Sequence, residues 1–181
     1  MLTVPDAAGT LDLRDYITEI PDHPKPGIVF RDLTPLFLDP AALEHSVSLL
    51  AAWAAEREVD YVLAAEARGF VLGGAVAARV GAGFVPARKP GRLPREAISV
   101  EYALEYGVDA LEVHRDALAG GARVLVHDDL IATGGTAEAL CRLVESAGAE
   151  VAGCAFVVEL AYLGGRERLG DRDILSLVTY R

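Results

Sequence analysis

The chain has 181 residues, of which 52% are hydrophobic and 24% are charged, and its formal net charge is −10. This length indicates one domain with room for a sizeable core. The acidic balance argues against sequence-independent binding to nucleic acid or to an anionic membrane, because both need clustered lysines and arginines. It does not exclude a small anionic substrate, since a few arginines gathered at one site can outweigh the overall charge.

Cysteine usage and the lack of a leader-like or membrane-spanning run indicate the cellular compartment. Cys141 and Cys154 fall in apolar patterns and outside any metal-ligand spacing, so we expect buried free thiols and no zinc site. No basic, apolar leader opens the chain, and no uncharged run reaches membrane-spanning length. These features predict a cytoplasmic protein that binds neither nucleic acid nor a membrane.

Hydrophobic periodicity and turn residues predict strands that alternate with helices. Three prolines between 21 and 27 predict a loop, and Asp39-Pro40 predicts a helix start. Helices are expected at 11–20, 39–57, 70–80 and around 140–147, with a short turn or helix at 163–169. Strands are expected at 28–30, 61–65, 84–87, 98–106, 110–114, 124–126, 151–160 and 174–179. Such alternation predicts an α/β fold with a mainly parallel sheet flanked by helices.

The stretch from Arg123 to Thr136 combines an apolar strand, two acids and a glycine turn. Asp128 and Asp129 are expected just beyond the strand end, and Thr133-Gly134-Gly135-Thr136 leads into a helix. A glycine turn at a helix N-terminus suits an anion, whereas two carboxylates would repel it unless ribose hydroxyls or a metal ion occupy them. The pattern therefore favours a sugar phosphate. An ordinary turn, with an aspartate at the strand end and a threonine N-cap, is the alternative.

A second turn is expected at the same edge of the sheet. Glu66-Ala67-Arg68-Gly69 follows the strand at 61–65, and ligands of open α/β sheets bind beyond the carboxyl ends of strands. We therefore expect this turn and the 128–136 stretch to face one crevice. The stretch lacks GxxxxGK[ST] and GxGxxG, which disfavours a nucleotide P-loop and a dinucleotide site.

Five ordered motifs resemble the type I phosphoribosyltransferases, and among them the adenine phosphoribosyltransferases. They are 23–35 (HPKPGIVFRDLTP), 66–70 (EARGF), 88–91 (RKPG), 104–107 (LEYG) and the 124–136 stretch. The resemblance implies a type I phosphoribosyltransferase fold in a single domain over 1–181, with an N-terminal hood and arm at about 1–34 and a flexible active-site loop at about 88–110. It also implies transfer of a phosphoribosyl group from phosphoribosyl pyrophosphate to adenine, giving AMP and pyrophosphate, with Mg²⁺ held mainly through the substrate and no direct protein ligand. A homodimer is expected from the resemblance only.

The resemblance also implies roles for individual residues. Asp128 and Asp129 would take the ribose hydroxyls, and Arg68 the pyrophosphate. The 5′-phosphate would lie on the loop formed by Ala132, Thr133, Gly134, Gly135 and Thr136. Further pyrophosphate contacts would come from Arg88, Lys89 and Arg92, although Arg92 stands where the family often has lysine.

The acceptor side of the predicted site is carried by other residues. Val29, Phe30, Arg31 and Leu130 would bind adenine. The side chains of Phe30 and Leu130 would sandwich the base, and backbone groups of Val29 and Arg31 would read its edge. Glu105 is the candidate acid/base that takes the proton from the attacking purine nitrogen, and Glu101 is its rival. His127 departs from the family pattern and is expected to be structural.

Three other functions remain possible from the residues alone. A 6-oxopurine phosphoribosyltransferase would use a lysine late in the sheet, but no lysine follows Lys89. A regulator that binds phosphoribosyl pyrophosphate without turnover would usually carry a DNA-binding module, for which this chain has no spare length. A generic sugar-phosphate binding domain would leave Arg68 and Glu105 unexplained.

Overall fold

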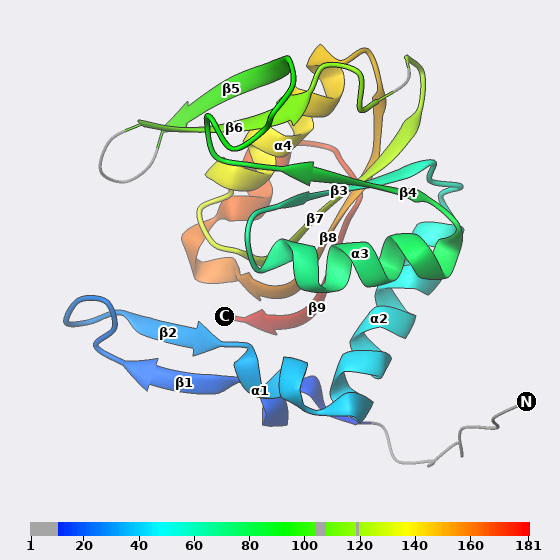
Figure 1. The fold of residues 1–181 in the computed structure, drawn as a ribbon. Coiled ribbons are helices and arrows are strands. Elements are labelled where there is room, and N and C mark those ends of the chain that lie inside the picture. Colours follow the sequence, from blue (N-terminus) through cyan, green and yellow to red (C-terminus); the bar gives the residue numbers. More distant parts are fainter. Residues whose placement is uncertain (1–10, 104–107, 119) are drawn as a thin grey trace, which may run out of the picture. The chain divides into compact units, whose positions relative to one another are not determined.

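The computed structural model of the chain describes residues 11–103, 108–118 and 120–181 (Figure 1). It divides into two compact units, residues 1–45 and 46–181, and each is described by itself. No helix among the described residues is long and apolar enough to cross a membrane.

The first unit holds an antiparallel strand pair and a short helix. Its elements are the 3₁₀ helix η1 (Leu13–Tyr16), β1 (Thr18–Pro21), β2 (Val29–Asp32) and α1 (Thr34–Leu38). The helix predicted at 11–20 is therefore wrong beyond Tyr16, because the backbone becomes extended at Ile17 and β1 pairs with β2. The short helix α1 was not predicted, although Asp32 accepts a hydrogen bond from the Thr34 N–H at 2.9 Å just at its start.

The second unit is built on a five-stranded sheet in the order β4-β3-β7-β8-β9. All four strand pairs are parallel, which confirms the predicted mainly parallel sheet. The strands are β3 (Tyr61–Ala65), β4 (Gly83–Ala87), β7 (Arg123–Ile131), β8 (Glu150–Leu160) and β9 (Ile174–Tyr180), with a separate antiparallel pair of β5 (Ala97–Ala103) and β6 (Val108–His114). The helices are α2 (Pro40–Ala55), which begins in the first unit, α3 (Gly69–Val80), α4 (Gly135–Ser146), and the 3₁₀ turns η2 (Ala161–Leu163) and η3 (Gly165–Leu169).

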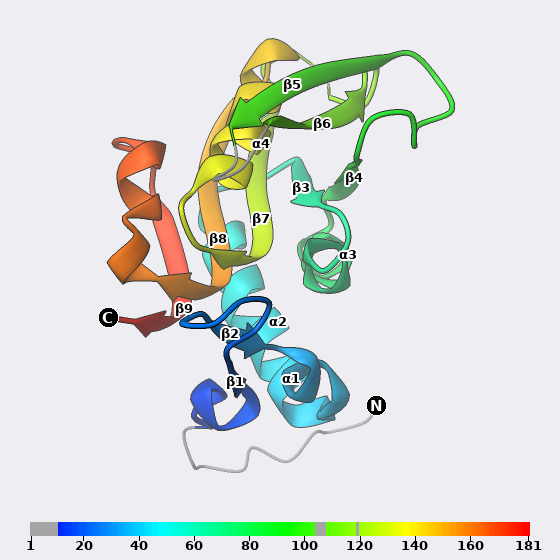
Figure 2. The same ribbon diagram turned by 90° about the vertical axis from the view of Figure 1, so that its left-hand side faces the viewer.

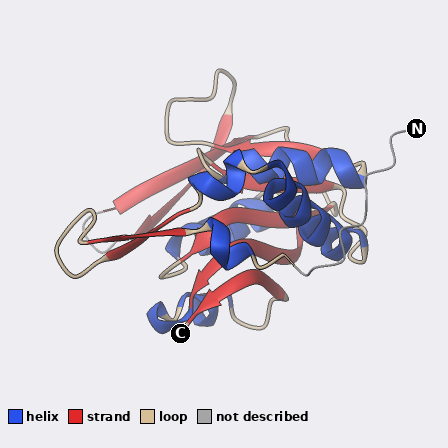
Figure 3. Cartoon of the chain, turned by 90° about the horizontal axis from the view of Figure 1, so that it is seen from below, coloured by secondary structure: helices blue, strands red, loops and turns tan. Residues whose placement is uncertain are grey.

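Helices pack on both faces of this sheet, as the alternation of strands and helices along the chain requires: Figure 1 shows α4 on one side of the central strands and α3 on the other, and Figure 3 marks helices and strands by colour. On one face, buried residues of α4 and of the β5–β6 pair form a single core with side chains from the central strands. Figure 2 shows β5 and β6 beside α4. On the other face α3 lies very close to the sheet. A Cβ added at Gly73 would come within 2.9 Å of the Ala64 Cβ and 3.5 Å of the His127 Cδ2.

Strand β7 is longer than the sequence indicates. It was expected to end at Val126, but it continues through both aspartates to Ile131, with Asp128 opposite Phe156 and Leu130 opposite Val158 of β8. Aspartate is unfavourable in strands on average, yet the neighbouring strand supplies backbone hydrogen bonds that override this local preference. The acidic pair is therefore held by the ladder of the sheet itself and is more rigid than a loop would make it.

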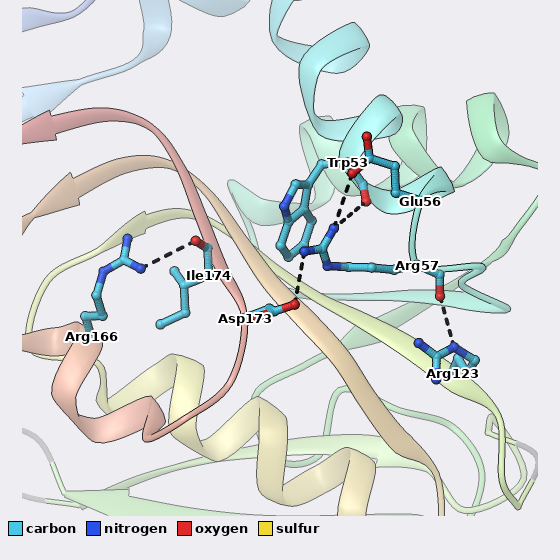
Figure 4. A network of polar contacts seen from close by, with 7 residues as sticks. All are labelled: Trp53, Glu56, Arg57, Arg123, Arg166, Asp173 and Ile174. Carbon is cyan, nitrogen blue, oxygen red and sulfur yellow. Dashed lines mark hydrogen bonds and ion pairs between the residues drawn. The ribbon is translucent and has the colours of Figure 1, made fainter.

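Arginines tie the elements together at the amino edge of the sheet, where the strands begin (Figure 4). The Arg57 guanidinium stacks on the Trp53 ring at 3.5 Å from its centroid and lies 3.1 Å from Asp173 Oδ2, just before β9. Arg123, the first residue of β7, donates from Nε to the Arg57 carbonyl at 2.9 Å. A Cβ at Gly153 would lie 2.4 Å from the Trp53 ring, so only glycine leaves room for this stack.

Candidate functional site

The turn after β3 and the acidic pair of β7 meet at the carboxyl edge of the sheet, as predicted. Arg68 Nε lies 2.8 Å from Asp129 Oδ2, so the guanidinium and the carboxylate form an ion pair. A Cβ at Gly69 would lie 2.9 Å from Asp128 Oδ1, so glycine is needed for α3 to begin so close to this carboxylate. The peptide bond between Glu66 and Ala67 in this turn is cis.

The two carboxyl groups share a poorly solvated position. Burial raises the pKa of Asp128 well above its usual range, and the neighbouring Asp129 charge raises it further. Burial also raises the pKa of Asp129, against the opposing effect of the Arg68 guanidinium. Carboxylates in this state gain most from a partner that donates hydrogen bonds to them, such as a pair of sugar hydroxyls.

The loop that follows β7 presents the start of α4 without a side-chain cap. Gly134 is the N-cap residue with φ of 83°, and no side chain accepts a hydrogen bond from the first turn. The alternative of a threonine N-cap therefore does not hold. Uncapped backbone N–H groups at the positive end of a helix are suited to an anion, and Thr133 and Thr136 are only partly buried beside them.

The predicted pyrophosphate cations lie at the end of β4, and carboxylates hold two of them. Arg88 Nε donates to Glu66 Oε2 at 2.8 Å, and the backbone N–H of Lys89 donates to Glu66 Oε1 at 3.0 Å. Burial would raise the pKa of Glu66, but these hydrogen bonds and the nearby arginine charges lower it. The Arg92 carbonyl accepts from Arg88 Nη1 at 3.3 Å. Glu66, treated only as part of a turn in the sequence analysis, thus organises this cluster.

Lys89 has a second carboxylate neighbour. Its ammonium group contacts Asp109 and lies 3.3 Å from the Tyr102 hydroxyl. Burial alone would lower the pKa of Lys89, but the hydrogen bonds to Asp109 and Tyr102 raise it. The charged ammonium is therefore retained between β5 and β6. Sequence reasoning missed Asp109, because only the antiparallel register that places it opposite Tyr102 reveals the contact.

The predicted base-binding residues are found in both units. In the first unit Val29, Phe30 and Arg31 are consecutive residues of β2, Phe30 makes an edge-on ring contact with His23 at 5.2 Å, and Arg31 pairs with Glu19. In the second unit Leu130 is a half-buried residue of β7. Glu105 lies outside the described residues, whereas its rival Glu101 is an exposed residue of β5.

His127 has the structural role that was expected. It is 1% exposed, and its Nδ1 lies 2.8 Å from the Ala155 carbonyl on β8. Burial lowers the pKa of His127 to about 4, although the hydrogen bond to Ala155 opposes this shift. The neutral ring therefore links β7 to β8 directly behind the acidic pair.

Comparisons with known proteins agree with this geometry. The family model described as phosphoribosyl transferase domain matches residues 38–177. The adenine phosphoribosyltransferase of Rubrobacter xylanophilus is 56% identical over 169 residues, which is 93% of this chain and 91% of the relative.

Solved structures agree as well. A crystal structure of adenine phosphoribosyltransferase from Thermoanaerobacter pseudethanolicus is 49% identical, has a TM-score of 0.90, and is matched over 93% of this chain and 98% of its own. The Saccharomyces cerevisiae adenine phosphoribosyltransferase, solved in a complex that contains adenine, is 36% identical with a TM-score of 0.85, over 91% of this chain and 96% of its own.

Proposed function

The chain belongs to the adenine phosphoribosyltransferase family, and we propose that it transfers the 5-phosphoribosyl group from phosphoribosyl pyrophosphate to adenine, giving AMP and pyrophosphate. The observation that carries the proposal is the meeting of the turn after β3 with the end of β7 at the carboxyl edge, where Arg68 pairs with the buried Asp129 beside an uncapped helix N-terminus. The names of the relatives supply the acceptor, adenine. The reaction is a step of purine salvage.

The ribose 5-phosphate half of the substrate is assigned to β7 and the loop after it. The 5′-phosphate accepts hydrogen bonds from backbone N–H groups and hydroxyls of the loop formed by Ala132, Thr133, Gly134, Gly135 and Thr136. The 2′- and 3′-hydroxyls donate to Asp128 and Asp129, whose burial makes them poor hosts for anything that brings no hydrogen-bond donor or positive charge. Both ends of the sugar phosphate are thus fixed by one rigid strand and one helix start.

The pyrophosphate is assigned to the cations around it. Arg68, Arg88, Lys89 and Arg92 lie at the ends of β3 and β4 or in the loop that follows, and guanidinium groups bind phosphate oxygens through paired hydrogen bonds. As the bond between the anomeric carbon and the pyrophosphate oxygen breaks, negative charge grows on the leaving group. Cations placed there in advance stabilise this charge.

Binding of the acceptor base is assigned to Val29, Phe30, Arg31 and Leu130. Removal of the proton from the base is assigned to Glu105. A purine nitrogen attacks the cationic, oxocarbenium-like anomeric carbon and must lose its proton as the new carbon–nitrogen bond forms. A carboxylate at Glu105 takes that proton. These assignments rest on the resemblance of the motifs to the family.

We place Mg²⁺ on the pyrophosphate of the substrate. Among the described residues no three His, Cys, Asp or Glu side chains gather as a metal site. We propose that the ion keeps several waters and binds mainly to the substrate phosphates, with no direct protein ligand. When bound, Mg²⁺ neutralises part of the leaving-group charge.

We also propose a cytoplasmic homodimer. Both cysteines are free and buried, which suits a reducing compartment. The dimer follows from the family resemblance, and light scattering of the purified protein will test it, with a monomeric mass as the contrary result.

One assay tests the reaction. The protein is incubated with phosphoribosyl pyrophosphate and Mg²⁺, and adenine, hypoxanthine and guanine are supplied separately while nucleotide is measured. We expect AMP from adenine and at most slow product from the 6-oxopurines. No AMP from adenine, or faster product from hypoxanthine, contradicts the proposal.

A further inference from the structure

The phosphate loop rests on the backbone of a distant turn. A Cβ added at Gly165 would lie 2.2 Å from the Ala132 carbonyl oxygen and 2.9 Å from the Gly134 nitrogen, and one added at Gly134 would lie 2.4 Å from the Gly165 carbonyl oxygen. The two backbones therefore touch with no side chain between them. No side chain caps the helix at Gly134, so the backbone of the Gly165 turn is the contact that supports the phosphate loop at this residue.

The turn that carries Gly165 is fixed by an ion pair. Arg166 donates from Nε to Glu159 Oε1 at 3.0 Å and from Nη2 to Glu159 Oε2 at 2.7 Å, so the two groups meet as a fork. The Glu159 side chain is only 7% exposed, and Arg166 also donates from Nη1 to the Ile174 carbonyl at 3.4 Å (Figure 4). The turn is thereby attached to both β8 and β9.

The position of Glu159 links this pair to the loop. Glu159 lies on β8 opposite Ile131, which is the last residue of β7 before the phosphate loop. A buried carboxylate in an apolar strand costs free energy unless it is paired, so its placement here needs a reason. The geometry offers a reason. Glu159 on β8 pairs with the end of β7 and also binds Arg166, so one strand holds both the phosphate loop and the turn that supports it.

We propose that Glu159 and Arg166 are positioning residues, which hold the Gly164–Gly165 turn against Ala132 and Gly134 and so set the affinity of the loop for a 5′-phosphate. This inference rests on the assignment of the loop to the 5′-phosphate under the proposed function. An anion is bound tightly by backbone N–H groups only when they converge beforehand, because otherwise binding must also order the loop. The pair supplies that order without contacting the substrate.

The experiment compares two glutamates at the ends of β8. Glu159→Gln breaks the fork, whereas Glu150→Gln removes an exposed ion pair with Arg123 at the amino edge and serves as the matched control. Binding of ribose 5-phosphate is measured by calorimetry, and KM for both substrates and kcat are measured in the AMP-forming assay. We expect Glu159→Gln to weaken ribose 5-phosphate binding and raise KM for phosphoribosyl pyrophosphate about tenfold, with KM for adenine and kcat nearly unchanged. Glu150→Gln should leave all four values unchanged.

A second variant guards against misfolding, since Glu159→Gln leaves a guanidinium without its carboxylate. Arg166→Lys keeps a cation beside the Glu159 carboxylate and is expected to fold, and Arg166→Gln combined with Glu159→Gln leaves neither charge without its partner. Arg166→Gln should weaken ribose 5-phosphate binding as Glu159→Gln does, Arg166→Lys should recover part of it, and the double variant should be no worse than either single one. Additive losses, equal losses for both substrates, or unchanged ribose 5-phosphate affinity in the Arg166 variants would overturn the inference. The binding measurement needs no adenine, so it stands apart from a failure of the proposed reaction.

Discussion

The two edges of the central sheet handle charge in opposite ways. At the amino edge, Arg57 and Arg123 each meet a carboxylate that is largely exposed, Asp173 and Glu150. At the carboxyl edge, Asp128 and Asp129 are adjacent and poorly solvated, and the pKa of each is raised by burial. Exposed pairs of the first kind contribute little to stability and nothing to binding. The second arrangement costs stability, and we infer that it is maintained for the substrate.

Two glycines give the largest contrast between the edges. Gly134→Ala puts a Cβ against the Gly165 carbonyl at a residue with φ of 83°, so the phosphate loop must move. Because several N–H donors are displaced together, kcat/KM for phosphoribosyl pyrophosphate should fall about a thousandfold. Gly153→Ala instead presses on the Trp53 ring and should lower the free energy of unfolding by about 1–3 kcal/mol with kcat/KM retained. Steady-state kinetics and denaturant unfolding of both variants check this, and similar kinetic losses in the two would contradict it.

His127, which precedes the acidic pair in β7, should make the free energy of unfolding depend on pH. Its pKa is about 4 in the folded protein, below the ordinary value of 6.5, so the unfolded chain binds more protons between these values. The contribution of His127 to stability should therefore be fully present above about pH 6.5 and be lost, by on the order of 3 kcal/mol, as the pH drops to 4. His127→Asn retains a donor for the Ala155 carbonyl and should remove most of this slope. Urea unfolding at several pH values measures it, and an unchanged slope would show that other groups are responsible.

Two arginines then separate binding from stability. Arg68→Gln removes the cation beside Asp129 and should reduce kcat/KM for phosphoribosyl pyrophosphate about fiftyfold, the equivalent of one strong charge-assisted hydrogen bond. Arg57→Gln removes the stack on Trp53 and the ion pair with Asp173, and should lower the melting temperature while kcat/KM stays within about twofold of the wild type. If Arg57→Gln lowers kcat/KM as much as Arg68→Gln does, the division between the edges is wrong.

The sequence predicted the elements whose signals are local. Strand β3 was placed at its observed bounds, because Tyr61–Ala65 is an unbroken apolar run between polar turns. The start of α2 was found because Asp39 accepts from the N–H groups of Ala41 and Ala42, both at 2.9 Å. These features depend on residues only a few positions apart, so they can be read without the fold.

The missed features depend on partners far along the chain. The extension of β7 through Asp128 and Asp129 requires pairing with β8, which starts at Glu150. The pair between Glu66 and Arg88 joins residues 22 positions apart, and the support of Gly134 by Gly165 joins two glycines that have no side chain to signal it. The candidate residues of the site were thus proposed from motifs, whereas the residues that contact them from distant parts of the chain needed the structure.

The most direct test of the account is the pH dependence of unfolding of Asp128→Asn, measured together with ribose 5-phosphate binding. Since the pKa of Asp128 is raised in the fold, this carboxyl binds more protons in the folded protein than in the unfolded chain, and its contribution to stability falls as the pH rises above the ordinary carboxyl value of 3.8. Asparagine does not titrate, so the variant should be more stable than the wild type by a margin that grows with pH, and it should bind ribose 5-phosphate more weakly. A variant that is less stable at neutral pH, or that binds ribose 5-phosphate as tightly as the wild type, would contradict the claim that the buried acids are kept for the substrate.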